Sequence, residues 1–302
     1  MQPSLGPTAT YLQLSEVAIS HRTSPIIVFA LRGRPALASF LDKLFARDVA
    51  VRIYGLAAIA IGLVGLVWGD FLAVWQPVPK SLPARTPLAY AIAAVFLLAG
   101  ASLQLRRTAR AGALTLTLLY SLGVVLLHLP DLIAHPSVFV MWSGTAEQLA
   151  LVAGGLMAYS FCLSGESQGV ERLARAMRAA RIARLIFGVC LIAFALAHLF
   201  YLKATADFVP AWIPPGQVFW AYATAAGHLA AAIALLSGIA ARLAARLLTA
   251  MFIVFGILVH APLAIADPHT HFNWAANAMN FALIGAAWLM AASGGRTPPA
   301  RP

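Results

Sequence analysis

The chain contains a series of apolar runs, each long enough to cross a lipid bilayer. The hydrocarbon core of a bilayer is roughly 30 Å thick, so a helix of about 20 apolar residues spans it. Eight such runs lie near residues 53–69, 88–103, 111–129, 145–163, 185–202, 218–236, 243–261 and 274–292. The sequence therefore predicts an all-α, polytopic membrane protein with about eight transmembrane helices.

The composition agrees with lipid as the main solvent of the chain. Of its 302 residues, 61% are hydrophobic and only 10% are charged, which is too little polar surface for a soluble fold. A formal net charge of +11 would suggest nucleic acid in a soluble protein, but here the basic residues lie between the apolar runs. We therefore expect the lipid bilayer, and no nucleic acid, as a partner.

The positions of Lys and Arg predict the orientation of the chain, because basic residues next to spans stay on the cytoplasmic side. With the N-terminus inside, all 21 Lys and Arg residues fall on the cytoplasmic side except Lys80, Arg85 and Lys203. Both termini are then expected in the cytoplasm. Residues 1–24 lack the pattern of a cleaved signal peptide, so the first span is expected to act as an uncleaved anchor.

The two halves of the chain match each other in one constant register. The segment LLHLPDLIAHP at 126–136 matches LVHAPLAIADP at 258–268, and AYAIAA at 89–94 matches AYATAA at 221–226. Each half holds an even number of spans, so we predict two parallel four-helix repeats side by side. The predicted segments are an N-terminal tail with a short amphipathic helix (1–52), repeat 1 (53–163), a basic linker (164–183), repeat 2 (184–292) and a C-terminal tail (293–302).

Histidines are the main candidates for chemistry, because an ionisable side chain in hydrocarbon is costly and usually faces the interior of a bundle. His198 lies near the outer end of the fifth run, His228 near the middle of the sixth, and His260 at the outer end of the seventh. His128 repeats His260, whereas apolar residues replace the other two in repeat 1. We therefore expect a site in repeat 2, with His228 as its main residue; purely structural histidines are the alternative.

Both repeats also carry a loop with tryptophan and proline on the outer side, WQPVP from Trp75 and VPAWIPP around Trp212. Such a loop could fold back over its bundle as a lid, or it could only anchor the chain at the membrane interface. On the lid interpretation, Trp212 and the nearby Trp220 are candidate ligand-binding residues.

Three polar residues in the fourth and eighth runs could add to the site. Asn277 and Asn280 could extend it along the eighth span, although hydrogen bonding between helices is the simpler role. Glu147 is expected in the first turn of the fourth span, where a carboxylate complements the positive end of the helix and Thr145 could cap it. A proton carrier is the alternative for Glu147.

Three kinds of ligand fit these residues. A neutral imidazole can hydrogen-bond a quinone carbonyl and pass a proton as the quinone is reduced. His198 and His260 could instead ligate a b-type haem, which we consider a poorer fit. A metal site is a weak candidate, because an alternating His-x-His loop is a poor signal; its residues would be His260, Asp267, His269 and His271. The chain lacks P-loop and HExxH motifs and has no convincing nucleophile with a base at useful spacing, so we do not expect a hydrolase, and whether it is an enzyme stays open.

Several short motifs occur together in repeat 2. They are AHLF at 197–200, VPAWIPP at 209–215, FWAY at 219–222 leading to Gly227-His228, and LVHAP at 258–262 followed by Asp267-Pro268. In this combination the repeat resembles the DoxX family of small bacterial four-helix membrane proteins. Some members of that family are linked to quinone-coupled sulfur oxidation or to membrane oxidoreductase complexes. The tandem duplication departs from the single-unit form of the family.

The resemblance implies a multi-pass protein of the bacterial inner membrane. Our leading hypothesis is a redox-associated accessory subunit that holds a quinone or similar lipophilic molecule in repeat 2, with redox-enzyme subunits as partners. A transporter or permease for a small solute, using the interface of the two repeats, is one alternative. A ligand-free structural or assembly subunit of a membrane complex is the other.

Overall fold

The computed structural model of the protein describes residues 35–165 and 169–293. These residues form helices and connecting loops, without any strand among them. The first 34 residues of the predicted N-terminal tail, and the C-terminal tail after Ser293, lie outside the described residues.

Eight helices in the described ranges are long and apolar enough to cross a membrane, so the prediction of about eight spans is confirmed. Two of them are composite, because a short π-helical turn joins two α-helical parts. The spans are α4 (Arg47–Trp68), α5 (Arg85–Ser102), α6 (Ala109–Gly123) with η2 (Val124–His128) and α7 (Leu129–Ala134), α8 (Phe139–Gly165), α9 (Val170–Phe200), α11 (Gln217–Ser237), α12 (Ala241–Phe255) with η3 (Gly256–His260) and α13 (Ala261–Ala266), and α14 (His271–Ala292).

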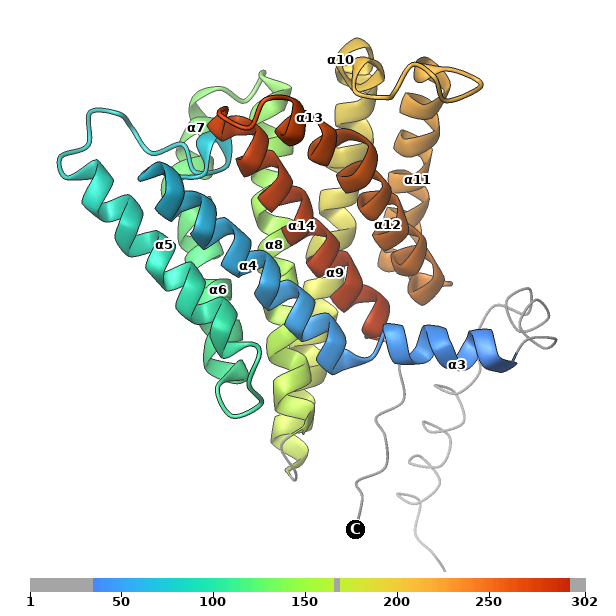
Figure 1. Ribbon diagram of the computed structural model, residues 1–302. Coiled ribbons are helices and arrows are strands. Elements are labelled where there is room, and N and C mark those ends of the chain that lie inside the picture. Colours follow the sequence, from blue (N-terminus) through green and yellow to red (C-terminus); the bar gives the residue numbers. More distant parts are fainter. Residues whose placement is uncertain (1–34, 166–168, 294–302) are drawn as a thin grey trace, which may run out of the picture.

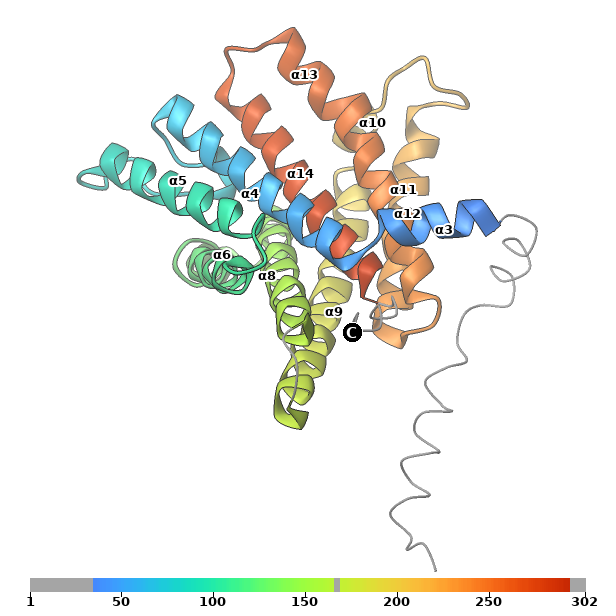
Figure 2. The same cartoon turned by 60° about the horizontal axis from the view of Figure 1, so that its bottom comes forward.

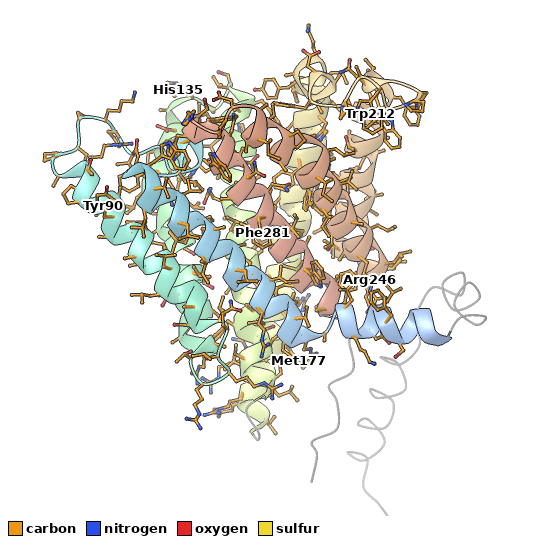
Figure 3. The ribbon with its side chains drawn as sticks, in the orientation of Figure 1. Tyr90, His135, Met177, Trp212, Arg246 and Phe281 are labelled. Carbon is orange, nitrogen blue, oxygen red and sulfur yellow. The ribbon has the colours of Figure 1, made fainter. Side chains whose placement is uncertain are left out.

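Helix α9 is longer than its apolar run, because it begins at Val170 and has 31 residues. Residues 170–187 contain neither glycine nor proline and are rich in Ala, Arg and Leu, which favour helix. Most of the basic segment 164–183, expected as a linker, therefore belongs to this helix. Its first turns project beyond most other spans at one end of the bundle, where Met177 is exposed (Figure 3).

The eight spans form one ring of neighbouring helices, in the order α4, α5, α6, α8, α9, α11, α12, α14 and back to α4 (Figures 1 and 2). In this ring the first helix of each predicted repeat packs against the fourth helix of the other repeat, α4 on α14 and α9 on α8. Helices α8 and α14 also contact each other. Each half therefore completes the packing of the other, and the division into two repeats stays a prediction.

Small residues let α4, α8 and α14 approach closely where the two halves meet. The hydroxyl of the fully buried Tyr54 on α4 donates a hydrogen bond to the carbonyl of Leu151 on α8, at 2.6 Å. Glycines face the same tyrosine from both sides: a Cβ atom on Gly285 would lie 2.9 Å from Tyr54 Cα, and one on Gly154 would lie 2.8 Å from Tyr54 Cε2. Close helix packing at small residues is a common way to hold membrane helices together.

Several local features of the first half of the chain occur again in the second half. They lie at the positions given by the sequence match, in which residue 126 corresponds to residue 258. The π-helical turns η2 and η3 begin at the corresponding residues 124 and 256. Trp142 and Trp274 each donate their indole N–H to the carbonyl of the preceding loop proline, Pro136 and Pro268, at 2.9 Å and 3.0 Å. These correspondences support the proposal that the chain holds two copies of one four-helix unit.

A short helix, α3 (Pro35–Leu44), lies across the end of the bundle at which α14 finishes (Figure 1). Asp42 of α3 pairs with Arg242 at 2.7 Å and with Arg246 at 3.1 Å. The indole of Trp288 on α14 donates to the carbonyl of Leu44 at 3.0 Å. The expected short helix before the first span is thus present, and it is attached to the start of α12 and to α14.

Candidate functional site

A cavity of about 310 Å³ lies among α9, α11, α12 and α14, towards the end of the bundle that carries α10 (Leu202–Asp207) and α13. Its walls are mainly apolar and aromatic, with contributions from Phe194, Phe208, Phe252 and Phe255. A few polar side chains also face it. A mostly apolar hollow with a small number of polar groups is the usual form of a site for a small organic ligand.

Two histidines form the polar centre of this cavity. The imidazole rings of His198 on α9 and His228 on α11 have centroids 4.8 Å apart. Nδ1 of His198 lies 2.9 Å from the carbonyl oxygen of Phe194, and Nδ1 of His228 lies 2.9 Å from the carbonyl oxygen of Thr224. Each bond joins a histidine to the residue one helical turn before it, so the backbone fixes the orientation of both rings.

Aromatic side chains surround His228, which is only 1% exposed. The ring of Phe194 meets it edge-on with centroids 5.8 Å apart, and the rings of Phe252 and Phe255 lie at 5.7 Å and 6.4 Å. A charged group is costly to hold in such apolar surroundings, so the structure favours the uncharged imidazole.

The third histidine, His260, also lines the cavity and is the last residue of the π-helical turn η3. The side-chain amide of Asn277 donates to the His260 carbonyl at 2.6 Å, and that of Asn280 donates to the Phe252 carbonyl at 3.2 Å. Both asparagines therefore join α14 to the composite seventh span, in line with the simpler role considered for them. Asn280 lines the cavity as well, whereas Asn277 is not among the lining residues.

Glu147 lies well inside α8, so its expected place in the first turn of the fourth span was wrong. The helix begins at Phe139, whose ring stacks on that of Phe200 with centroids 4.5 Å apart. Thr145 is therefore no cap, and its hydroxyl donates to the Met141 carbonyl at 2.6 Å. The hydropathy of the sequence located the apolar run but not this earlier start of the helix.

Glu147 and Trp75 belong to repeat 1, yet both line the cavity of repeat 2. Trp75 ends the short helix η1 (Ala73–Trp75), and its indole N–H donates to the Glu147 carboxyl group. The Trp75 ring also stacks on Phe272 with centroids 5.5 Å apart, and the Trp75 carbonyl lies 3.1 Å from Nε2 of His128. The sequence indicates a Trp75 loop over its own repeat, and no pattern in the sequence indicates that the loop reaches the other repeat.

The two other tryptophans considered as ligand-binding residues do not line the cavity. Trp212 is 74% exposed and lies in the loop at the outer edge of the bundle (Figure 3). Trp220 donates its indole N–H to the Pro214 carbonyl at 3.0 Å. Instead Phe208 and Val209, which come just before the proline-rich turn, contribute to the wall.

The residues of the weak metal candidate are not brought together. In the described ranges, no group of three or more His, Cys, Asp or Glu side chains is arranged to hold a metal ion. Asp267 accepts a hydrogen bond from the Thr270 hydroxyl, and His271 stacks on Trp68 with ring centroids 5.2 Å apart. His269 is exposed, and His260 faces the cavity. A haem between His198 and His260 stays a prediction.

Comparison with known proteins identifies one family. Residues 179–261 match the family model described as DoxX. The match runs from α9 to the first residue of α13, and it includes His198, His228 and His260. No curated protein and no solved structure matches the chain significantly.

Proposed function

We propose that this integral membrane protein, which contains a DoxX domain at residues 179–261, is a redox-associated accessory subunit that binds a quinone or a similar lipophilic ring. The observation that carries the proposal is the pair of histidine rings, with centroids 4.8 Å apart, in a cavity of about 310 Å³ within the membrane-spanning helices. Redox-enzyme subunits of the membrane are the partners that this role requires.

The walls of the cavity suit the body of such a ligand. Phe194, Phe252 and Phe255 offer aromatic faces and edges to a flat ring, and such contacts stabilise more than area burial alone. Polar side chains that interrupt this wall, among them His198 and His228, would orient the oxygen atoms on the ring.

The same groups could exchange protons with a bound ligand. Glu147 on the same wall is a carboxyl group that can accept or return a proton, and the uncharged histidines can accept a hydrogen bond from a hydroxyl group of the ring. A change in the redox state of a quinone alters how many protons its oxygens carry. Titratable groups against the ring are therefore what a quinone-linked function needs.

The proposal places the protein in the bacterial inner membrane, with both termini in the cytoplasm. Basic residues support this orientation: Arg106, Arg110, Arg242 and Arg246 lie near helix ends on the side of the bundle that carries α3, whereas Lys203 is on α10 at the opposite side. The cavity would then lie in the outer half of the membrane.

Replacing His228 with Phe is expected to remove most of the quinone-type ring, counted as quinone plus hydroquinone, that purifies with the protein. Phenylalanine is suited to the test because Phe96 corresponds to His228 in the match between the two halves, and it is buried in repeat 1. The measurement is solvent extraction of the detergent-purified protein followed by mass spectrometry. We expect wild type to release quinone in stoichiometric amounts and His228→Phe to release about tenfold less, the effect of losing one hydrogen bond at a buried site.

The control is His269→Ala, because His269 is an exposed histidine in the loop before α14. That variant should release as much quinone as wild type. Equal amounts of quinone in all three proteins would contradict the proposed site, and phospholipid alone in all three would contradict the proposed ligand class.

A further inference from the structure

The positions of the hydrogen atoms on the two central histidines follow from their partners. A carbonyl oxygen can only accept a hydrogen bond, so Nδ1 of His198 must donate to Phe194 and Nδ1 of His228 must donate to Thr224. In a neutral imidazole only one nitrogen carries a hydrogen. Nε2 of each ring is therefore a lone-pair acceptor, as long as the ring is uncharged.

The surroundings keep these rings uncharged. Two imidazolium cations with ring centroids 4.8 Å apart would repel each other strongly in an apolar cavity. No carboxylate forms an ion pair with either ring among the residues that the structure describes. The pair therefore offers hydrogen-bond acceptors, and not donors, to a ligand.

Several other polar groups on the cavity wall already donate their hydrogen atoms to acceptors within the protein. The Ser143 hydroxyl donates to the Val140 carbonyl at 3.1 Å, and the Thr224 hydroxyl donates to the Trp220 carbonyl at 2.8 Å. The Trp75 indole donates to Glu147. Groups that can still donate are few, namely His260, Thr205, the second amide hydrogen of Asn280, and Glu147 when it is protonated.

We infer that the cavity binds the reduced, hydroxyl-bearing form of a quinone-type ring in preference to the oxidised form. A hydroquinone can donate its phenolic O–H to Nε2 of His198 or His228. A quinone carbonyl placed there would face a lone pair and stay without a hydrogen bond, which costs about a factor of ten in affinity or more. This inference rests on the proposed function, and it adds which redox form the site recognises.

The test compares the two redox forms of one probe, decyl-substituted benzoquinone and its hydroquinone, by calorimetric titration of the detergent-solubilised protein without oxygen. We expect the hydroquinone to bind wild type at least about tenfold more tightly than the quinone. His228→Phe and His198→Leu copy the apolar residues of repeat 1, Phe96 and Leu66. Because either ring can act as the acceptor, the double variant with both substitutions should bring the two affinities to within about threefold of each other, while His269→Ala should keep the wild-type preference.

The outcomes separate this inference from the function on which it rests. If quinone binds wild type as tightly as hydroquinone, the redox preference is wrong and the quinone site survives. If neither form binds, both proposals are wrong. A preference for hydroquinone that persists in the double variant would overturn the assignment of His198 and His228 as its acceptors.

Discussion

Replacing Trp75 with alanine is expected to weaken ligand binding in the cavity by about tenfold or more. The indole forms part of the cavity wall, stacks on Phe272 and donates to Glu147, so the substitution removes an aromatic surface and leaves a partly buried carboxyl group without its partner. A tenfold change in affinity corresponds to about 1.4 kcal/mol, which is about the size of one aromatic contact between the cavity wall and a ring-shaped ligand. Calorimetric titration with the decyl hydroquinone measures the effect.

Trp212→Ala is the matched control, because Trp212 is 74% exposed and does not line the cavity. Its affinity for the same probe should equal that of wild type. The opposite result would be weaker binding by Trp212→Ala and unchanged binding by Trp75→Ala. It would show that the cavity of repeat 2 is covered by the Trp212 loop of the same repeat and not by the Trp75 loop. Thermal unfolding of both variants should be recorded as well, so that loss of binding is not confused with loss of folded protein.

Gly285→Ala is expected to lower the free energy of unfolding by about 1–3 kcal/mol, the usual cost of overpacking. A Cβ atom at this position would lie 2.9 Å from the backbone Cα of Tyr54, so α14 and α4 would have to move apart. This contact joins the two halves of the molecule, and the strain cannot be relieved by rotating a side chain. Thermal or denaturant unfolding, followed by circular dichroism, measures the change.

Gly123→Ala provides the comparison for this prediction. Gly123 is also helical, but nothing lies within 4 Å of a Cβ atom built there. In a helix, alanine is favoured over glycine by about 0.5–1 kcal/mol, so this variant should be as stable as wild type or slightly more stable. Equal unfolding of Gly285→Ala and Gly123→Ala would mean that the contact between α14 and α4 is not tightly packed.

The spans were predictable because each depends on local properties of the sequence. About 20 apolar residues in succession need lipid, whatever their neighbours are. Helix ends were less predictable, because they depend on contacts made far along the chain. Phe139 at the start of α8 stacks on Phe200, and no count of apolar residues between 145 and 163 could reveal that contact.

The candidate site was predictable only in part. The cost of placing histidines in hydrocarbon singled out His198, His228 and His260, and all three line the cavity. Trp75 and Glu147 could not be assigned to the same cavity, because the sequence does not state which repeat a loop will cover. Their place follows from the packing of α9 on α8 and of α4 on α14, which is a property of the assembled ring.

The exchange of packing partners between the two halves bears on how such a chain can evolve. In a dimer of identical subunits every substitution appears twice. A substitution that removes the binding site from one subunit therefore also removes it from the other. On the proposed duplication, a single chain escapes that restriction. Leu66 and Phe96 stand where His198 and His228 stand in the second half, while Glu147 of the first half helps to form the surviving cavity. On this proposal the first half serves as scaffold for the second, and ligand preference can change in the second half without a compensating change in the first.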